Sequence, residues 1–117
     1  MSVRIAVLGA GRIGQVHARA IAGHDAAVLA AIADPIVAAA NVIADQYGCD
    51  VRTIDEIAAS DDVDGVIICT PTDTHANLIE KFVHCGKAIF CEKPIDLGVD
   101  RVRACLEVVN KACLLYT

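Results

Sequence analysis

The feature that most constrains this chain is a run of glycines between a short apolar segment and a stretch with helical spacing. Residues 3–8 are apolar except for Arg4, and residues 9–14 read Gly-Ala-Gly-Arg-Ile-Gly. Glycine can make a sharp turn, and it lets a helix approach a strand with no Cβ between them. The run therefore predicts a strand over 3–8, a tight turn, and a helix over 12–22.

The rest of the chain alternates short β-branched runs with helical stretches. Further strands are expected at 28–33, 50–52, 65–69 and 87–91, with a sixth at 113–116, and further helices at 36–47, 73–85 and 99–111. A Thr-Ile-Asp-Glu capping box at 53–56 opens one more short helix. Strands that alternate with helices pair in parallel, so the fold class is α/β: a doubly wound parallel sheet of Rossmann type in three αβα layers, with residues 1–117 as one domain.

Two local details follow from spacing and capping rules. On the helix at 12–22, Ile13, Val16 and Ala20 recur at three- and four-residue steps and are expected on the buried face. Asp73 stands where an N-cap would begin the helix after the fourth strand.

Composition argues against several classes of protein. The net charge is −5 and no basic patch is interleaved with aromatics, so nucleic acid is not an expected partner. The first residues lack the layout of a signal peptide, and no apolar run reaches the ~18 residues of a membrane span. The six cysteines form no C-x-x-C pair and several lie in hydrophobic runs, which favours buried thiols over metal ligands. A cytoplasmic protein without membrane or metal sites is expected.

The glycine run also has the spacing G-x-G-x-x-G of a dinucleotide-binding turn. Its position after a strand and at the start of a helix makes the motif far stronger than the glycines alone. Gly9 would make the turn, Gly11 would admit a pyrophosphate to the backbone, and Gly14 would let the helix pack on the sheet. The helix N-terminus would supply unpaired N–H groups for the phosphates.

An acidic residue then indicates which dinucleotide is bound. Asp34 ends the second expected strand, 20 residues after Gly14, where such folds place an acid that accepts hydrogen bonds from the adenosine ribose. A carboxylate there repels a 2′-phosphate, and residues 35–38 offer no Arg or Lys to bind one. NAD is therefore expected rather than NADP. Asp34 also suits an N-cap before Pro35 at the first helical position.

Two more polar segments follow expected strand ends: residues 70–75, Thr-Pro-Thr-Asp-Thr-His, and residues 92–94, Glu-Lys-Pro. Parallel strands bring their carboxyl ends to one edge, where ligands bind in open α/β sheets. Lys93 could share a proton with a substrate hydroxyl, or it could be a solvated lysine. His75 could face the cofactor or lie on the helix surface. The Lys93–Pro94 bond could be cis or trans.

Three stretches taken together, Val-Leu-Gly-Ala-Gly-Arg-Ile-Gly, Ile-Cys-Thr-Pro-Thr-Asp-Thr-His and Ile-Phe-Cys-Glu-Lys-Pro-Ile-Asp-Leu, resemble the glucose-fructose oxidoreductase and inositol dehydrogenase family, most closely its inositol dehydrogenase branch. The resemblance runs from Ser2 to about Lys111. It implies an enzyme that oxidises a secondary hydroxyl of myo-inositol, or of a related cyclitol or sugar, to a ketone by hydride transfer to NAD. By position Lys93 matches the family's catalytic-site lysine. The implied cofactor contacts are Gly9, Ala10, Gly11, Arg12, Ile13, Asp34, Thr70, Pro71, His75, Glu92 and Lys93.

The same resemblance implies a second, sheet-rich substrate domain, which in the family supplies an acid and a general-base histidine and through which members usually assemble as homo-oligomers. The chain stops at Thr117, so we expect a fragment that lacks this domain, binds NAD and turns over negligibly. Two other functions stay open from the residues alone: a non-catalytic dinucleotide-sensing module, and a methyltransferase-like domain that binds S-adenosylmethionine through the glycine loop.

Overall fold

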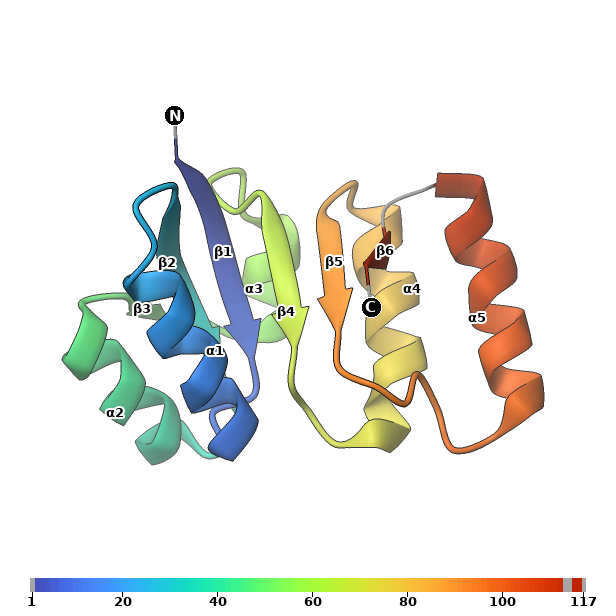
Figure 1. Ribbon diagram of the computed structural model, residues 1–117, viewed down its shortest axis with the longest axis horizontal. Coiled ribbons are helices and arrows are strands. Elements are labelled where there is room, and N and C mark those ends of the chain that lie inside the picture. Colours follow the sequence, from blue (N-terminus) through green and yellow to red (C-terminus); the bar gives the residue numbers. More distant parts are fainter. Residues whose placement is uncertain (1, 113–114, 117) are drawn as a thin grey trace.

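The computed structural model describes residues 2–112 and 115–116. Their strands form one parallel sheet in the order β3-β2-β1-β4-β5-β6 (Figure 1). The strands are β1 Val3–Leu8, β2 Ala27–Ala33, β3 Asp50–Val51, β4 Gly65–Ile68, β5 Ala88–Cys91 and β6 Leu115–Tyr116. The chain winds outward from β1 in one direction to β3, then returns to β4 and winds the other way, which confirms the doubly wound α/β sheet.

Helices cover both faces of this sheet. They are α1 Arg12–Ala22, α2 Val37–Tyr47, α3 Ile54–Ala59, α4 His75–His84 and α5 Val99–Ala112, with a 3₁₀ turn, η1, at Thr72–Thr74. One hydrophobic cluster joins α1 and α2 to β1 and β2, and a second joins α3, α4 and α5 to β1, β2, β4 and β5. The three αβα layers are therefore confirmed, with α1 and α2 in front of the sheet in Figure 1.

The first helix buries a different face from the one expected. Gly14, Ala18 and Ile21 are its buried residues, whereas Ile13 and Val16 are 46% and 56% exposed. The expectation was wrong because it gave no weight to glycine, whereas the face that meets the sheet runs from Gly14 through Ala18 to Ile21. Gly14 has no side chain, which lets the helix approach the sheet closely there.

The expected N-cap at Asp73 is also wrong. Asp73 lies in η1, and Thr74 occupies the cap position of α4 without a side-chain capping bond. The hydroxyl of Thr74 lies 2.6 Å from the carbonyl oxygen of Pro71 instead. The 3₁₀ turn thus shifts the helix start past Asp73. Of the expected sixth strand, residues 113–114 lie outside the described part of the chain.

Several cysteines lie among residues 2–112 and 115–116, and Cys49, Cys69, Cys85 and Cys105 are free thiols. Cys91 and Cys105 are buried, whereas Cys85 is exposed. In this part of the chain no His, Cys, Asp and Glu side chains gather in a group that could hold a metal ion, and no helix has the length and apolar character needed to cross a bilayer.

Two glycines set the crossing of α1 over the sheet. Gly9 has φ +106°, and a Cβ there would lie 2.6 Å from the carbonyl oxygen of Cys69. A Cβ at Gly14 would lie 1.8 Å from the carbonyl oxygen of Gly9. Both distances are shorter than atoms can pack. The turn, α1 and the end of β4 can therefore lie this close only because positions 9 and 14 are glycines.

Replacing Gly14 with Ala should therefore destabilise the chain by about 3 kcal/mol, because the new methyl group displaces α1 from the sheet. Urea unfolding followed by circular dichroism measures this. Gly11→Ala is the matched control in the same turn, since φ is −76° there and no atom lies within 4 Å of its Cβ position. The control should lose less than about 1 kcal/mol. Equal stability of the two variants would contradict the steric account.

Candidate functional site

A cavity of about 720 Å³ opens at the carboxyl ends of β1, β2 and β4, where the winding direction of the sheet reverses. Seven of the residues expected at the site line it: Gly9, Gly11, Arg12, Ile13, Asp34, Thr70 and Pro71. Its other lining residues are Ala33, Pro35, Ile36, Ile54, Cys69, Thr74 and Leu78. The sequence did not point to this second group because most of its members are apolar. Of the expected residues, Ala10, His75, Glu92 and Lys93 do not line the cavity.

The N-terminus of α1 faces this cavity through the glycine turn. Gly11 is the N-cap residue and makes no side-chain capping bond, and the first turn of α1 has no acidic side chain. The space that a Cβ of Gly11 would fill is empty within 4 Å. The first N–H groups of α1 and the open space above Gly11 are together the features that an anion-binding site at a helix N-terminus requires.

Asp34 ties the glycine turn to the end of β2. One carboxylate oxygen accepts a hydrogen bond from the backbone N–H of Ala10 at 2.7 Å, and the other accepts one from Ile36 at 2.8 Å. The expected N-cap role is wrong, because α2 begins at Val37 with Ile36 as the cap residue. A carboxylate oxygen can accept more than one hydrogen bond, so Asp34 keeps acceptor capacity toward the cavity that it lines.

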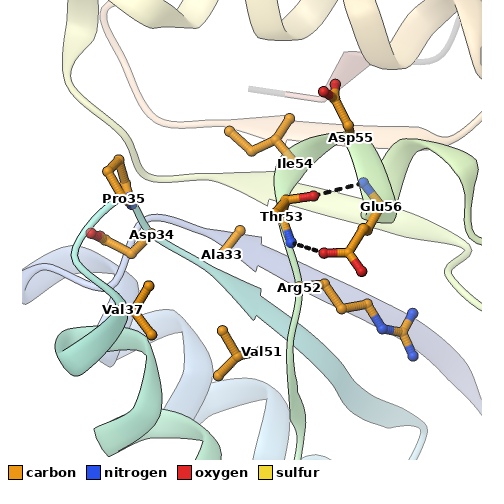
Figure 2. Close-up of a pocket in the computed structure, with 10 residues that line it drawn as sticks. All are labelled: Ala33, Asp34, Pro35, Val37, Val51, Arg52, Thr53, Ile54, Asp55 and Glu56. Carbon is orange, nitrogen blue, oxygen red and sulfur yellow. Dashed lines mark hydrogen bonds between the residues drawn. The ribbon is translucent and has the colours of Figure 1, made fainter.

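A second cavity of about 380 Å³ adjoins the first along Ala33, Asp34, Pro35 and Ile54 (Figure 2). The expected capping box forms part of its wall. The backbone N–H of Thr53 donates to the carboxylate of Glu56 at 2.9 Å, and the N–H of Glu56 donates to the hydroxyl of Thr53 at 3.1 Å. These bonds fix the start of α3, and with it Ile54, which lines both cavities.

Arg52 lines this second cavity and was missed by the sequence analysis, which considered only the residues directly after Asp34. Its guanidinium points away from Asp34 in Figure 2. It donates to Asp62 at 2.8 and 2.9 Å, and to Asp50 at 2.8 Å. The hydrogen bonds from Arg52 lower the pKa of Asp62 to about 2. Two carboxylates therefore engage this positive charge on the side facing away from Asp34.

His75 is buried, so its alternative as a surface histidine is wrong. Only 2% of its surface is exposed. Its Nε2 lies 2.8 Å from the carbonyl oxygen of Thr70, and its Nδ1 lies 2.8 Å from the carbonyl oxygen of Pro94. Both ring nitrogens are thus engaged by the backbone. His75 joins the segment after β4 to the segment after β5.

The Glu-Lys-Pro segment continues from the end of β5. Nε2 of His17, on α1, lies 2.5 Å from a carboxylate oxygen of Glu92, and the ring of His17 is 5.7 Å from that of Phe90. No local pattern could have predicted this pair, because the two residues are 75 positions apart. Lys93 is exposed, and the Lys93–Pro94 bond is cis.

Residues 3–117 match a family described as "Oxidoreductase family, NAD-binding Rossmann fold". An inositol 2-dehydrogenase of Rhizobium meliloti (strain 1021) is 64% identical over 110 residues, which cover 94% of this chain and 33% of that relative.

Solved structures of inositol dehydrogenases are also similar to this chain. A myo-inositol dehydrogenase from Corynebacterium glutamicum ATCC 13032 has a TM-score of 0.91 and 44% identity, over 98% of this chain and 35% of that one. A scyllo-inositol dehydrogenase from Lactobacillus casei with bound NAD(H) and scyllo-inositol has a TM-score of 0.91 and 28% identity, again over 98% and 35%. The chain spans about a third of the length of these proteins.

The geometry of Asp34 yields a test of its structural role. In Asp34→Asn one acceptor oxygen becomes an N–H₂ donor, so either Ala10 or Ile36 loses its hydrogen bond. The free energy of unfolding should fall by about 1–3 kcal/mol, measured by urea unfolding. Asp45→Asn, an exposed change on α2, should leave stability unchanged. If Asp34→Asn matched the wild type, the carboxylate would not hold the glycine turn.

Proposed function

The chain belongs to the oxidoreductase family with an NAD-binding Rossmann fold, and from this premise we propose that it is the NAD-binding part of an inositol 2-dehydrogenase-like enzyme. That enzyme oxidises a secondary hydroxyl of myo-inositol, or of a related cyclitol or sugar, to a ketone. The family match agrees with the resemblance that the sequence motifs indicated. The substrate class rests on the names of the relatives, which are inositol dehydrogenases.

The observation that carries NAD binding is the meeting of three predicted elements at one cavity. The glycine turn, Asp34 and the Thr70–Pro71 segment come from three different strand ends and line the same space. An extended dinucleotide fits this arrangement with its pyrophosphate over Gly11 and the N-terminus of α1, and its adenosine ribose at Asp34. The empty volume above Gly11 supports this placement.

The charges around Asp34 favour NAD over NADP. The carboxylate of Asp34 would repel a 2′-phosphate on the adenosine ribose. Arg52 lines the adjoining cavity together with Asp34, and its guanidinium is held by Asp50 and Asp62. Arg52 is therefore engaged by two carboxylates of the chain and is not directed at a 2′-phosphate.

Lys93 is our candidate for the catalytic residue. When bound, NAD supplies the hydride acceptor. Lys93 leaves the same edge of the sheet, and its ammonium can hydrogen-bond the substrate hydroxyl and share its proton. Hydride transfer also requires the reacting carbon to be held close to the cofactor in an aligned pose. We propose that residues beyond this chain provide that hold, so this chain alone binds NAD without turnover.

The setting of the enzyme is part of the same proposal. We infer a cytoplasmic protein with reduced cysteines, acting on a small-molecule substrate. In the full-length enzyme we infer a homo-oligomer that assembles through its substrate domain.

NAD binding can be tested at Gly11. Gly11→Ala should fold normally but bind NAD at least about tenfold more weakly, a loss of about 1.4 kcal/mol, because its methyl group occupies the pyrophosphate space. Titration calorimetry with NAD, NADP and S-adenosylmethionine measures this on the 117-residue chain. Gly23→Ala, whose Cβ would have ordinary contacts, should bind as the wild type does. Preference for S-adenosylmethionine would refute the proposal.

The role of Lys93 can be tested in a graft. Residues 1–111 of this chain would be joined to the part of the Rhizobium meliloti relative that lies beyond the matched region. We expect turnover of myo-inositol, followed by absorbance of reduced NAD, and loss of that turnover in Lys93→Ala with NAD affinity retained. Arg103→Ala, on the exposed face of α5, should keep full activity.

Undiminished turnover in Lys93→Ala would instead favour a non-catalytic role. Steady turnover by the 117-residue chain alone would contradict the need for further residues.

A further inference from the structure

Lys93 lies where the sheet has ended. The last sheet hydrogen bond on this strand runs from the N–H of Glu92 to the carbonyl oxygen of Ile68, at 3.2 Å. Lys93 and Pro94 are both exposed. A segment of this kind has few contacts of its own to fix it, so the position of Lys93 depends on what holds its two neighbours.

His75 holds one neighbour. It is nearly fully buried at the first residue of α4, and its ring lies between the carbonyl oxygens of Thr70 and Pro94, at 2.8 Å from each. Thr70 also lines the larger cavity. The ring thus connects a residue of the cavity wall to the residue that follows Lys93.

The two acceptors determine how many N–H groups the His75 ring needs in order to make both hydrogen bonds. Backbone carbonyl oxygens carry no hydrogen, so each bond needs an N–H on the histidine. A neutral imidazole has one N–H and a protonated imidazole has two. The bridge is complete with a protonated ring and lacks one bond with a neutral ring.

His17 holds the other neighbour. Its Nε2 meets the carboxylate of Glu92 at 2.5 Å, which ties the residue before Lys93 to α1. α1 is the helix that opens from the glycine turn. Lys93 is therefore flanked by two tethers, one to the helix of the glycine turn and one to the cavity wall.

We propose that His75 is a positioning residue: by bridging Thr70 and Pro94 it holds Lys93 at a fixed place beside the cavity, with the His17–Glu92 pair as the second tether. The bridge is a property of the fold, and only its catalytic consequence rests on the proposed function of Lys93.

Other ionisable groups lie on the elements around His75. They include Cys69 after β4, Asp73 on η1, Glu80, Lys81 and His84 on α4, Cys91, Glu92 and Lys93 at and after the end of β5, and Asp96, Arg101 and Cys105 toward and on α5. Burial raises the pKa of Cys69 and of Cys91 to about 12, so both are neutral thiols at neutral pH. Arg101 donates to Glu80 and Asn77. Glu92 is paired with His17.

The bridge can be tested in the 117-residue chain without substrate. Nitrogen-15 spectra of the His75 ring should show both nitrogens bonded to hydrogen while the bridge is intact. If one ring nitrogen of His75 carried no hydrogen in the folded chain, the proposal would be overturned.

Variants give a second readout. His75→Phe keeps a ring but no N–H, and it should raise hydrogen exchange of the Glu92 amide about tenfold, as expected for the loss of a hydrogen bond. His84→Phe, at the exposed end of the same helix, is the matched control and should change nothing. Unchanged exchange at Glu92 in a folded His75→Phe chain would overturn the proposal.

The catalytic consequence is measured in the graft. His75→Phe should lower kcat about tenfold with little change in NAD affinity, and it should have no further effect once Lys93 is Ala. An additive effect in the double variant would show that His75 does not act through Lys93. If the wild-type chain failed to bind NAD, the proposed function would fail, while the exchange and ring spectra would still decide whether the bridge exists.

Discussion

The site depends on one close crossing, that of the glycine turn with α1 and the end of β4. Gly14 lies against the carbonyl group of Gly9, and Gly9 lies against that of Cys69, so three segments meet with no side chain between them. This contact brings the N-terminus of α1 to the point where the sheet reverses its winding. The cavity exists because α1 starts there and Asp34 holds the turn against β2.

Charge is arranged around this cavity by short-range pairing. Arg52 lines the same cavity as Asp34, but it donates its hydrogen bonds to Asp50 and Asp62. Because these two carboxylates pair with its charge, Arg52 does little to neutralise Asp34. A residue's position next to a site is therefore a poor guide to its effect on a ligand when stronger partners lie on its other side.

The same distinction explains what the sequence could predict. The glycine spacing, the order of strands and helices and the Thr53–Glu56 capping box are local patterns, and the structure confirms them. The buried face of α1 was missed because the closest packing involves Gly14, which has no side chain to give an apolar signal. The bridges made by His17 and His75 join residues far apart in sequence, and no spacing rule finds such pairs.

The two halves of the proposed chemistry are also held by different means. The proposed cofactor surface combines the backbone of the glycine turn with the carboxylate of Asp34, which is held by two backbone N–H groups at the ends of buried strands, so it is as rigid as the core on which it lies. Lys93 is on an exposed segment, and its place depends on hydrogen bonds of neighbouring side chains rather than on packing. Binding of NAD therefore draws on the stability of the whole fold, whereas the reach of Lys93 depends on a few polar contacts. Substitutions that leave the core and the cofactor cavity intact can still move the one side chain expected to meet the substrate.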